Sequence, residues 1–285
     1  MTDPADLHIH TTASDGTSTF DQRISQAVER GLDAIAITDH DRITSDLSER
    51  VHRRDDILIV TGVEVRADLS GSKIELLGYF VDPVAETLDS TLSTARRYRR
   101  RRNRTLAERL TDETGLDVDH EELTDRAGGM LGRPHFARYL VERGVVDSVS
   151  EAFEEYLGPG GEAYVPMERL SHERVIDAIH AADGLVSLAH PGRIRSGQVP
   201  EMVDTLVDAD LDAIEVWYPY GPDPTVTVED AAALADEHGL LKTGGSDCHG
   251  PDSGKFRIGD VRVPAAEFDD LLRAAGLTDA VGRFE

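Results

Sequence analysis

Histidines and carboxylates, the side chains that bind divalent metal ions, stand at several places in the chain, each within or just after a short apolar run. In the stretch DLHIHTTASDG, His8 and His10 are two residues apart and Asp15 follows them. Residues i and i+2 of a β-strand point to the same side, so both imidazoles can reach one ion. The same spacing separates Asp247 from His249 in GGSDCHG. Both stretches therefore predict metal ligands.

Three more apolar runs carry a residue of the same kind: AIAITDHD contains His40, LIVTGVEV contains Glu64 and LVSLAHPG contains His190. In a parallel sheet these residues would lie at the carboxyl ends of the strands, where α/β folds place their ligands. One strand-end histidine is more often structural than a ligand, but the recurrence of the pattern favours a metal site. The eight candidates exceed the needs of one ion, which predicts two or three ions sharing bridging carboxylates. Imidazole and carboxylate together favour Mn, Fe or Zn over Ca or Mg.

The elements that must position these residues alternate between apolar, β-branched runs and amphipathic helical stretches. The run DAIAIT, for example, precedes a polar stretch that we expect to be helical to about Arg54. This alternation predicts an α/β fold with a parallel sheet covered by helices, either a barrel or a doubly wound sheet. No glycine-rich dinucleotide or phosphate-loop motif follows any of the runs, so a doubly wound nucleotide-binding fold has little support.

A helix-rich block interrupts the alternation between residues 85 and 167, with a long polar helix expected near residues 88–114. Barrel enzymes vary the loops at the mouth of the barrel, and we interpret the block as a small helical insertion that caps the substrate there. The expected organisation is a barrel formed by residues 1–84 and 168–285, with residues 85–167 inserted into it.

The composition is that of an acidic globular protein. Of the 285 residues 39% are hydrophobic, and 55 Asp and Glu against 30 Lys and Arg give a formal net charge of −25. This charge argues against a membrane surface or a long nucleic-acid duplex as a partner. Because the acidic residues are spread along the whole chain, we favour the surface of a protein from a salt-accumulating halophile over an acidic interaction protein.

We expect a cytoplasmic protein. No apolar run reaches the roughly 18 residues that span a bilayer, and the first residues lack the pattern of a secretory signal. The single cysteine, Cys248, agrees with a reducing compartment. It stands between two candidate ligands, but alternation along a strand turns its side chain away from theirs.

An arginine run, ARRYRRRRNR, places seven arginines in a chain that otherwise avoids clustered positive charge. Such a run is commonly a solvated helix face, but a guanidinium can also bind two phosphate oxygens at once. Helical spacing puts Arg97, Arg101 and Arg104 roughly on one face, and Arg99 with Arg102 on a neighbouring one. Because the run lies in the insertion, beside the predicted metal site, we favour a phosphate-binding role.

The motifs DLHIHTTASDG, ITDHD, GVEV, AHPG and GSDCHG, in this order, resemble the metal-site motifs of the PHP (polymerase and histidinol phosphatase) superfamily. The resemblance covers essentially the whole chain and implies a distorted (β/α)7 TIM-like barrel with two or three divalent ions, most often Mn. The residues that match its ligand positions are His8, His10, Asp15, His40, Glu64, His190, Asp247 and His249. Glu75 stands where relatives commonly have histidine, so the ninth candidate ligand is a carboxylate, which adds negative charge at the third ion.

The helical block adds GRPHFARYLVERG and EAFEEYLGPGGEAYVP, which resemble the branch that contains nucleoside 3′,5′-bisphosphate phosphatases and 5′-to-3′ exoribonucleases. This implies release of the 3′-phosphate from a small nucleotide, or removal of nucleotides from the 5′ end of short RNA, by a metal-activated water. His10, Asp15 and Asp247 are the implied catalytic residues. The implied substrate contacts are Arg99, Arg100, Arg101, Arg102 and His135, with Arg133 as a further candidate.

The sequence leaves two other functions open. A phosphatase for another monoester, such as histidinol phosphate, would use the same metal site but leaves the arginine run unexplained. A non-catalytic regulatory module, as some PHP domains are within larger polymerases, would explain the metal ligands without a reaction. The ligand set, complete apart from Glu75, favours an enzyme.

Overall fold

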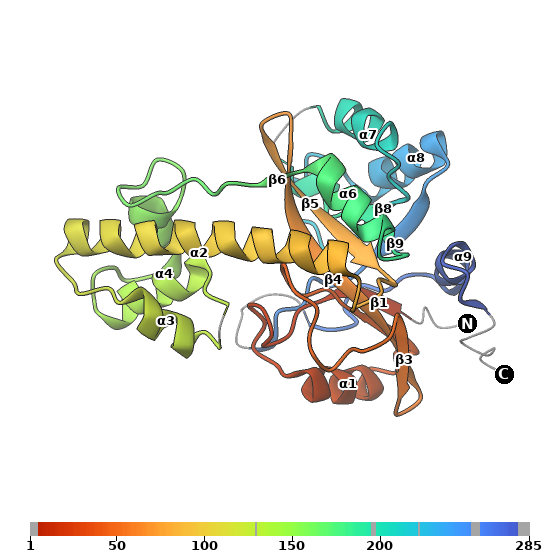
Figure 1. Ribbon diagram of the computed structural model, residues 1–285, viewed down its shortest axis with the longest axis horizontal. Helices are drawn as coiled ribbons and strands as arrows, with labels where there is room; N and C mark the ends of the chain where they lie inside the picture. The colour runs from red at the N-terminus through yellow and green to blue at the C-terminus, as the bar shows by residue number, and fades with distance from the viewer. Residues whose placement is uncertain (1–4, 129, 195–197, 222, 252–256, 279–285) are drawn as a thin grey trace. The chain divides into compact units, whose positions relative to one another are not determined.

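The computed structural model describes residues 5–278 except 129, 195–197, 222 and 252–256. It divides into two compact units. The first, called the sheet unit, comprises residues 1–93 and 170–285, and the second, called the helical unit, comprises residues 94–169. The chain leaves the sheet unit along one long helix, α2 (Glu86–Thr114), whose first turns belong to the sheet unit (Figure 1).

The strands of the sheet unit pair into one curled sheet (Figure 1). Those among the described residues are β1 Ala5–Ile9, β2 Ala34–Ile37, β3 Val51–Arg54, β4 Ile57–Leu69, β5 Ser72–Tyr79, β6 Leu170–Ser171, β7 Leu185–Leu188, β8 Ala213–Trp217 and β9 Leu241–Gly244. Their order is β1-β2-β4-β5-β7-β8-β9, and β3 and β6 also pair with β4. A bridge between Ile9 and Cys248 links the chain after β9 back to β1, so the two edges of the curled sheet meet there, as in a distorted barrel.

The sheet is mixed. β1, β2 and β4 run parallel, as do β7, β8 and β9, but β5 is antiparallel to both β4 and β7. The predicted α/β fold is confirmed, whereas the expectation of an all-parallel sheet is wrong at β5. The reason is local: Ser70 and Gly71, with φ of 51° and 88°, form a two-residue turn that joins β4 directly to β5. Positive φ at both positions matches the twist of a tight hairpin.

Helices cover the sheet on its outside and at its edges (Figure 1). They are α1 Phe20–Glu29, α6 His172–His180, α7 Val199–Val207, α8 Val228–His238 and α9 Ala265–Ala274. In α1, Thr19 caps the first turn in a reciprocal box with Gln22. Phe20, Ile24 and Ala27 follow at helical spacing, and all three are buried in the core beside the sheet.

The second strand shows why both faces of the sheet are apolar. Ala34 and Ala36 of β2 belong to the core cluster that includes residues of α9, whereas Ile35 and Ile37 belong to the cluster that includes residues of α1. Successive side chains of a strand point to opposite faces, so a strand covered on both faces is apolar throughout.

The segment after β2 differs from the expectation. Instead of a helix to about Arg54, turns lead into β3, which is antiparallel to β4. Asp55 and Asp56, with φ of 50° and 64°, make the tight turn between these two strands. Nε2 of His52 accepts hydrogen bonds from the backbone N–H groups of Ser48 and Glu49, so side chains satisfy the backbone where a helix would have used its own carbonyls.

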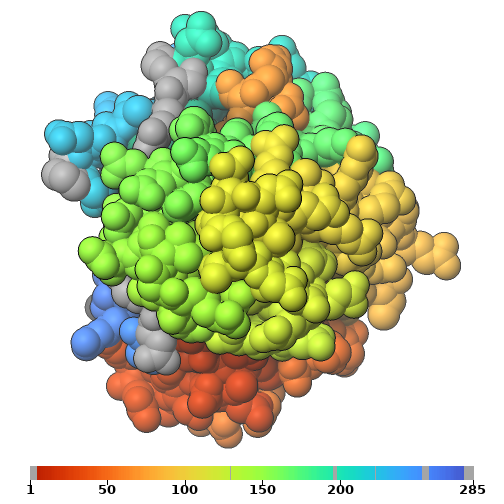
Figure 2. Space-filling model, turned by 90° about the vertical axis from the view of Figure 1, so that its left-hand side faces the viewer, coloured from red at the N-terminus to blue at the C-terminus, as the bar shows by residue number. Residues whose placement is uncertain are grey.

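The helical unit has a hydrophobic core of its own. It contains the rest of α2 with α3 His120–Arg126, α4 Arg133–Glu142, α5 Val149–Ala152 and the π-helical turn η1 Phe153–Leu157. Leu106, Leu110, Phe136, Leu140 and Leu157 are fully buried in its core. Figure 2 shows the closely packed surface of this unit in yellow and green. Among the described residues, none of the helices combines the length and the apolar character needed to span a bilayer.

Candidate metal centre

The residues predicted as metal ligands meet at one end of the curled sheet. Most of them follow parallel strands: His40 comes after β2, His190 after β7, and Asp247 and His249 after β9. Glu75 lies in the first half of β5. Because β5 runs in the opposite direction, its early residues reach the end of the sheet where the parallel strands finish.

Three overlapping groups among the described residues hold their ligand atoms within 4.8 Å of one another. They are His10, Asp15, His40 and His249; His8, His10 and Asp247; and His40, Glu64 and Glu75. His10 and His40 each belong to two groups, so ions held by them would be neighbours. Buried clusters of imidazoles and carboxylates suit several metal ions.

The Glu64 carboxylate lies at the centre of these groups and is 1% exposed. Its Oε2 lies 2.9 Å from Nδ1 of His40 and 3.4 Å from Nε2 of His10. Its Oε1 lies 3.1 Å from Nε2 of His190. A carboxylate whose two oxygens face different imidazoles is suited to bridge two ions.

Two aspartates complete the other groups. Oδ1 of Asp15 lies 3.3 Å from Nε2 of His249, and Oδ1 of Asp247 lies 3.2 Å from Nε2 of His10. Asp247 and His190 have left-handed φ values of 51° and 31°. Such a backbone conformation is uncommon in residues other than glycine and clusters at functional sites.

The residues fit metal ions. Nε2 of His8, both ring nitrogens of His10 and Nδ1 of His40 are buried, and although carboxylate oxygens lie close to them, none makes a hydrogen bond of acceptable geometry with a described residue. Buried polar atoms normally have a partner, and coordination would supply one here. The donor atoms, imidazole nitrogens and carboxylate oxygens, are those that bind Mn, Fe and Zn.

Electrostatics at the centre favours the metal-binding form of His10 and of two carboxylates. Burial and the neighbouring rings of His249 and His40 lower the pKa of His10 to about 3, so this ring is neutral near neutral pH. Burial acts to raise the pKa of Asp15 and of Glu64, but the nearby imidazoles outweigh it and hold both well below their usual range. A neutral imidazole beside ionised carboxylates is ready to bind a divalent ion. For His8 and His40, burial acts to lower the pKa, but the neighbouring carboxylates outweigh it and raise the pKa, so an ion bound there would displace protons.

Sequence reasoning missed Glu215, which orients two of the predicted ligands. Glu215 is fully buried in β8. Its Oε1 lies 2.8 Å from Nδ1 of His8, and its Oε2 accepts a hydrogen bond from the backbone N–H of His190 at 2.7 Å. Fixing Nδ1 turns Nε2 of His8 toward the cluster. The signal that could have revealed it is a glutamate inside the apolar run DAIEVWY, since buried carboxylates are normally paired.

Asp39 supports the loop that carries Asp15. Although Asp39 ends an apolar run beside His40, it is not a member of the three groups. Its carboxylate accepts hydrogen bonds from the backbone N–H of Thr11 at 2.8 Å, from the Thr11 hydroxyl at 2.6 Å and from the Ser14 hydroxyl. These bonds fix the turn between His10 and Asp15.

Tyr218 and Arg193 hold the second oxygen of Asp247. The Tyr218 hydroxyl donates to Oδ2 of Asp247 at 2.8 Å, and Nη1 of Arg193 lies 3.2 Å from the same oxygen. Nη1 of Arg193 also donates to the Tyr218 hydroxyl at 2.8 Å. The carboxylate is therefore held by one oxygen while the other faces His10.

The predicted substrate-binding arginines lie in the helical unit, on α2. Arg99 and Arg102 are each 5% exposed, whereas Arg100 and Arg101 are exposed. Arg101 forms a surface ion pair with Glu168 at 3.0 Å. Burial thus separates Arg99 and Arg102 from the other arginines of the run.

Arg133 and His135 lie at the start of α4. Nη1 of Arg133 donates to a backbone carbonyl of η1 at 3.1 Å, so this arginine has a structural contact. Nδ1 of His135 accepts from the backbone N–H of Gly132 at 3.0 Å, which places the proton of the neutral ring on Nε2. Asn103 of α2 donates to the carbonyl of Leu131 at 2.7 Å and so ties the arginine run to the segment before α4.

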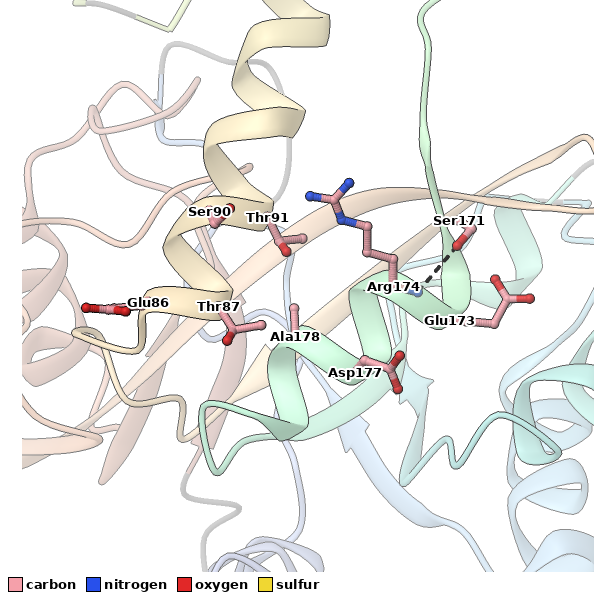
Figure 3. Close-up of a pocket in the computed structure, with 9 residues that line it drawn as sticks. All are labelled: Glu86, Thr87, Ser90, Thr91, Ser171, Glu173, Arg174, Asp177 and Ala178. Atoms are coloured by element: carbon pink, nitrogen blue, oxygen red, sulfur yellow. Dashed lines mark hydrogen bonds between the residues drawn. The ribbon is translucent and has the colours of Figure 1, made fainter.

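A separate surface pocket of about 850 Å³ lies between the first turns of α2 and α6 (Figure 3). Its lining residues are Glu86, Thr87, Ser90, Thr91, Ser171, Glu173, Arg174, Asp177 and Ala178. None of the predicted ligands is among them. One guanidinium among three carboxylates gives this pocket no net attraction for a phosphate.

Comparison with known proteins agrees with this geometry. The model of the PHP domain family matches residues 6–203. The 5'-3' exoribonuclease Rnm of Salmonella typhimurium is 34% identical over 252 residues, which cover 86% of this chain and 85% of the relative. The 3',5'-nucleoside bisphosphate phosphatase of Chromobacterium violaceum is 32% identical over 267 residues, which cover 89% of this chain and 90% of the relative.

A solved structure agrees as well. A protein from Bifidobacterium adolescentis that is assigned as a metal-dependent phosphoesterase is 29% identical, with a TM-score of 0.82 and 99% of both chains covered. The resemblance inferred from the motifs is thereby confirmed. The chain belongs to the PHP family and is a metal-dependent phosphoesterase.

Proposed function

We propose that this chain hydrolyses phosphate esters of small nucleotides, releasing the 3′-phosphate of a nucleoside 3′,5′-bisphosphate, or removes nucleotides from the 5′ end of short RNA. The observation that carries the proposal is the buried set of three overlapping ligand groups around Glu64. The names of the two relatives, an exoribonuclease and a bisphosphate phosphatase, support this class of substrate.

The ions are assigned to eight of the nine ligands predicted from the sequence, all except Glu75. These are His8, His10, Asp15, His40, Glu64, His190, Asp247 and His249. Mn is the expected ion, with Fe and Zn as alternatives, because the donors are imidazoles and carboxylates. When bound, such ions lower the pKa of a water molecule and neutralise the charge of the phosphoryl oxygens.

His10, Asp15 and Asp247 are the catalytic residues in this proposal. His10 belongs to two ligand groups, and each aspartate completes one of them. Hydrolysis proceeds without a covalent enzyme intermediate in this proposal, because the sequence contains neither a G-x-S-x-G element nor a cysteine followed by a phosphate-binding loop. The single cysteine, Cys248, is buried, and its Sγ accepts a hydrogen bond from Arg23 at 3.2 Å.

The second phosphate of the substrate is assigned to Arg99 and Arg102, with His135. A buried guanidinium that binds phosphate through two bonds resists screening by salt better than an exposed one. This matters if the acidic surface is an adaptation to concentrated salt, as we infer from the net charge of −25. Arg100, Arg101 and Arg133 are secondary candidates because they are exposed or have structural contacts.

A phosphate-release assay in high potassium chloride tests the proposal. The Mn-loaded protein is offered adenosine 3′,5′-bisphosphate, 5′-phosphorylated short RNA and histidinol phosphate side by side. We expect turnover of the nucleotide substrates and little of histidinol phosphate. A preference for histidinol phosphate would contradict the nucleotide assignment, and absence of hydrolysis by fully loaded protein would favour the regulatory module.

Variants separate the two parts of the site. D247A is expected to lower kcat by at least about a hundredfold, because it removes a ligand. R99Q/R102Q is expected to raise KM for the bisphosphate by about tenfold or more, because charge-assisted hydrogen bonds to one phosphate are lost. R97Q/R104Q removes the same charge from exposed positions of the same helix and is expected to leave KM unchanged. An equal change in KM for the two double variants would contradict the assignment of Arg99 and Arg102 to the second phosphate.

A further inference from the structure

Two cationic side chains contact Glu75, one of the two carboxylates of the third ligand group. Nε of Arg66 lies 2.6 Å from Oε1 of Glu75, and Nζ of Lys73 lies 3.1 Å from Oε2. The Glu75 side chain is 7% exposed, whereas those of Arg66 and Lys73 are 21% and 49% exposed. Lys73 is one of only three lysines in the chain, so its place on this carboxylate stands out.

The register of the sheet builds this arrangement. Arg66 is directly opposite Glu75 in the antiparallel pairing of β4 with β5. Lys73 is two residues before Glu75 on β5, and Glu64 is two residues before Arg66 on β4, so all four side chains share one face. Opposite charges at paired positions of neighbouring strands stabilise the pairing. The hairpin thus fixes two cations beside the third group.

These cations compete with a metal ion at that position. An ion bound by His40, Glu64 and Glu75 would have to displace one cation from Glu75 or share an oxygen with it. Either choice brings a divalent ion next to a guanidinium or an ammonium at a carboxylate that is itself buried, where repulsion between like charges is only partly screened by water.

The second ligand group is built differently. Arg193 and Tyr218 engage Oδ2 of Asp247, whereas Oδ1 lies 3.2 Å from Nε2 of His10. One oxygen of Asp247 is therefore free of cations and directed at the rings, whereas each oxygen of Glu75 is paired with a cation, and Oε2 lies 3.5 Å from Nε2 of His190 as well.

We propose that this protein acts with two metal ions, and that Arg66 and Lys73, held by Glu75, supply the positive charge at the third position. The role of that charge in phosphate ester hydrolysis rests on the function proposed above. The number of bound ions does not depend on the proposed function, because it can be measured on protein that hydrolyses no substrate.

Metal counting tests the proposal. The full chain is stripped with a chelator and titrated with Mn, and bound metal is measured by calorimetry and by elemental analysis after gel filtration. We expect about two tightly bound ions per chain. R66Q/K73Q frees Glu75 and is expected to bind a third ion at least about tenfold more tightly than the unaltered protein does. R54Q/K242Q removes one arginine and one lysine charge elsewhere in the sheet unit, and this control variant is expected to bind two ions, as the unaltered protein does.

A second variant keeps the test decisive if R66Q/K73Q fails to fold. E75Q nearly preserves the shape of the side chain, and because Glu75 is not a ligand in this proposal, the number of bound ions is expected to stay at two. K73Q alone alters a half-exposed lysine and is expected to strengthen the third ion in the same direction as the double variant.

Three results would overturn the proposal. They are three ions bound with similar affinity by the unaltered protein, loss of one ion in E75Q, and a third ion no tighter in R66Q/K73Q or K73Q. Manganese anomalous scattering from a crystal of the unaltered protein tests the same point. A peak between Glu64 and Glu75 would place an ion at the third position and contradict the proposal. Failure of phosphate release with two ions bound would instead contradict the proposed function and leave the ion count standing.

Discussion

Nδ1 of His8 lies 2.8 Å from Oε1 of Glu215, and neither side chain has any exposed surface. The pair joins the first strand of the sheet to β8 and also supports His190, whose backbone N–H donates to the other oxygen of Glu215. Glu215 therefore acts as an acceptor at both oxygens. It does not belong to the three ligand groups, and it acts on the metal centre by positioning two of the proposed ligands.

E215Q tests this positioning role. A glutamine has one acceptor oxygen and one donor NH2 group, so it cannot accept from both His8 and His190. We expect Mn affinity to fall by about ten- to a hundredfold, the usual effect of losing the partner of a metal-bound histidine. The measurement is calorimetric titration with Mn, and E201Q on the exposed face of α7 is the matched control. Unchanged affinity in E215Q would show that the hydrogen bonds to His8 and His190 do not orient the ligands.

A buried arginine ties two ligand-bearing segments together. Arg23 of α1 is fully buried; Nε and Nη2 donate to the backbone carbonyl of His10 at 2.9 and 2.7 Å, and Nη2 also donates to the carbonyl of Cys248 at 3.0 Å. A lysine keeps the charge but not the planar fork. We expect R23K to reduce the free energy of unfolding by about 2–4 kcal/mol, since several hydrogen bonds to a charged group are lost.

Urea unfolding of the metal-free protein measures this loss. R23K should lower the urea concentration at the unfolding midpoint. The dependence of the unfolding free energy on urea concentration should change little, because the surface area exposed on unfolding stays similar. R30K is the control, since Arg30 is exposed at the end of the same helix and its ion pair with Asp260 is 3.8 Å long. Equal midpoints for R23K and R30K would contradict a bridging role for Arg23.

Much of the fold could be predicted because strands covered on both faces are apolar throughout, as Ala34–Ile37 is. The antiparallel direction of β5 could not be predicted, because it depends on a tight turn at Ser70 and Gly71. In the sequence, these two turn residues are less conspicuous than the alternation of strands and helices around them. The hairpin at Asp55 and Asp56 was missed for the same reason, since aspartates with positive φ resemble any polar segment in sequence.

The ligands could be predicted one segment at a time, because histidine and carboxylate beside apolar runs are unusual residue choices. Their partners could not. Whether Arg66 faces Glu75 depends on the register of β4 with β5, and whether Glu215 reaches His8 depends on how far the sheet curls. Such relationships between strands are set by tertiary structure, and a sequence read strand by strand does not contain them.

Removal of the metal ions should destabilise the sheet unit. The centre places ionised carboxylates and unsatisfied ring nitrogens, such as those of His10, in a buried cluster. Ions that bind only the folded protein add about 2.7 kcal/mol at a free concentration of a hundred times Kd. We expect Tm to rise with Mn concentration and to fall on chelation, as followed by circular dichroism in constant salt. H10A should lose most of this dependence, and an Mn-dependent Tm that is the same in H10A would contradict the ligand assignment.

A pair remote from the metal centre gives the chain a predictable pH dependence. Nε2 of His180 lies 2.8 Å from Oδ2 of Asp212, and this hydrogen bond, opposed by partial burial, raises the pKa of His180. A histidine whose pKa is higher in the folded than in the unfolded protein adds stability that is complete below the unfolded pKa of about 6.5. That stability disappears as the pH rises through the higher, folded pKa. Because the ring is 33% exposed, we expect about 0.5 kcal/mol.

H180Q isolates this contribution, because glutamine can still hydrogen-bond to Asp212 but does not titrate. Urea unfolding of both proteins in chelator, at several pH values, cancels the titration of groups common to them. The difference in unfolding free energy should be largest near about pH 5.5 and should shrink as the pH rises above the unfolded pKa. D212N should abolish the same component, since the hydrogen bond to its carboxylate is what raises the pKa of His180. A difference that stays constant with pH, or that grows toward alkaline pH, would show that the His180–Asp212 pair is not the titrating element.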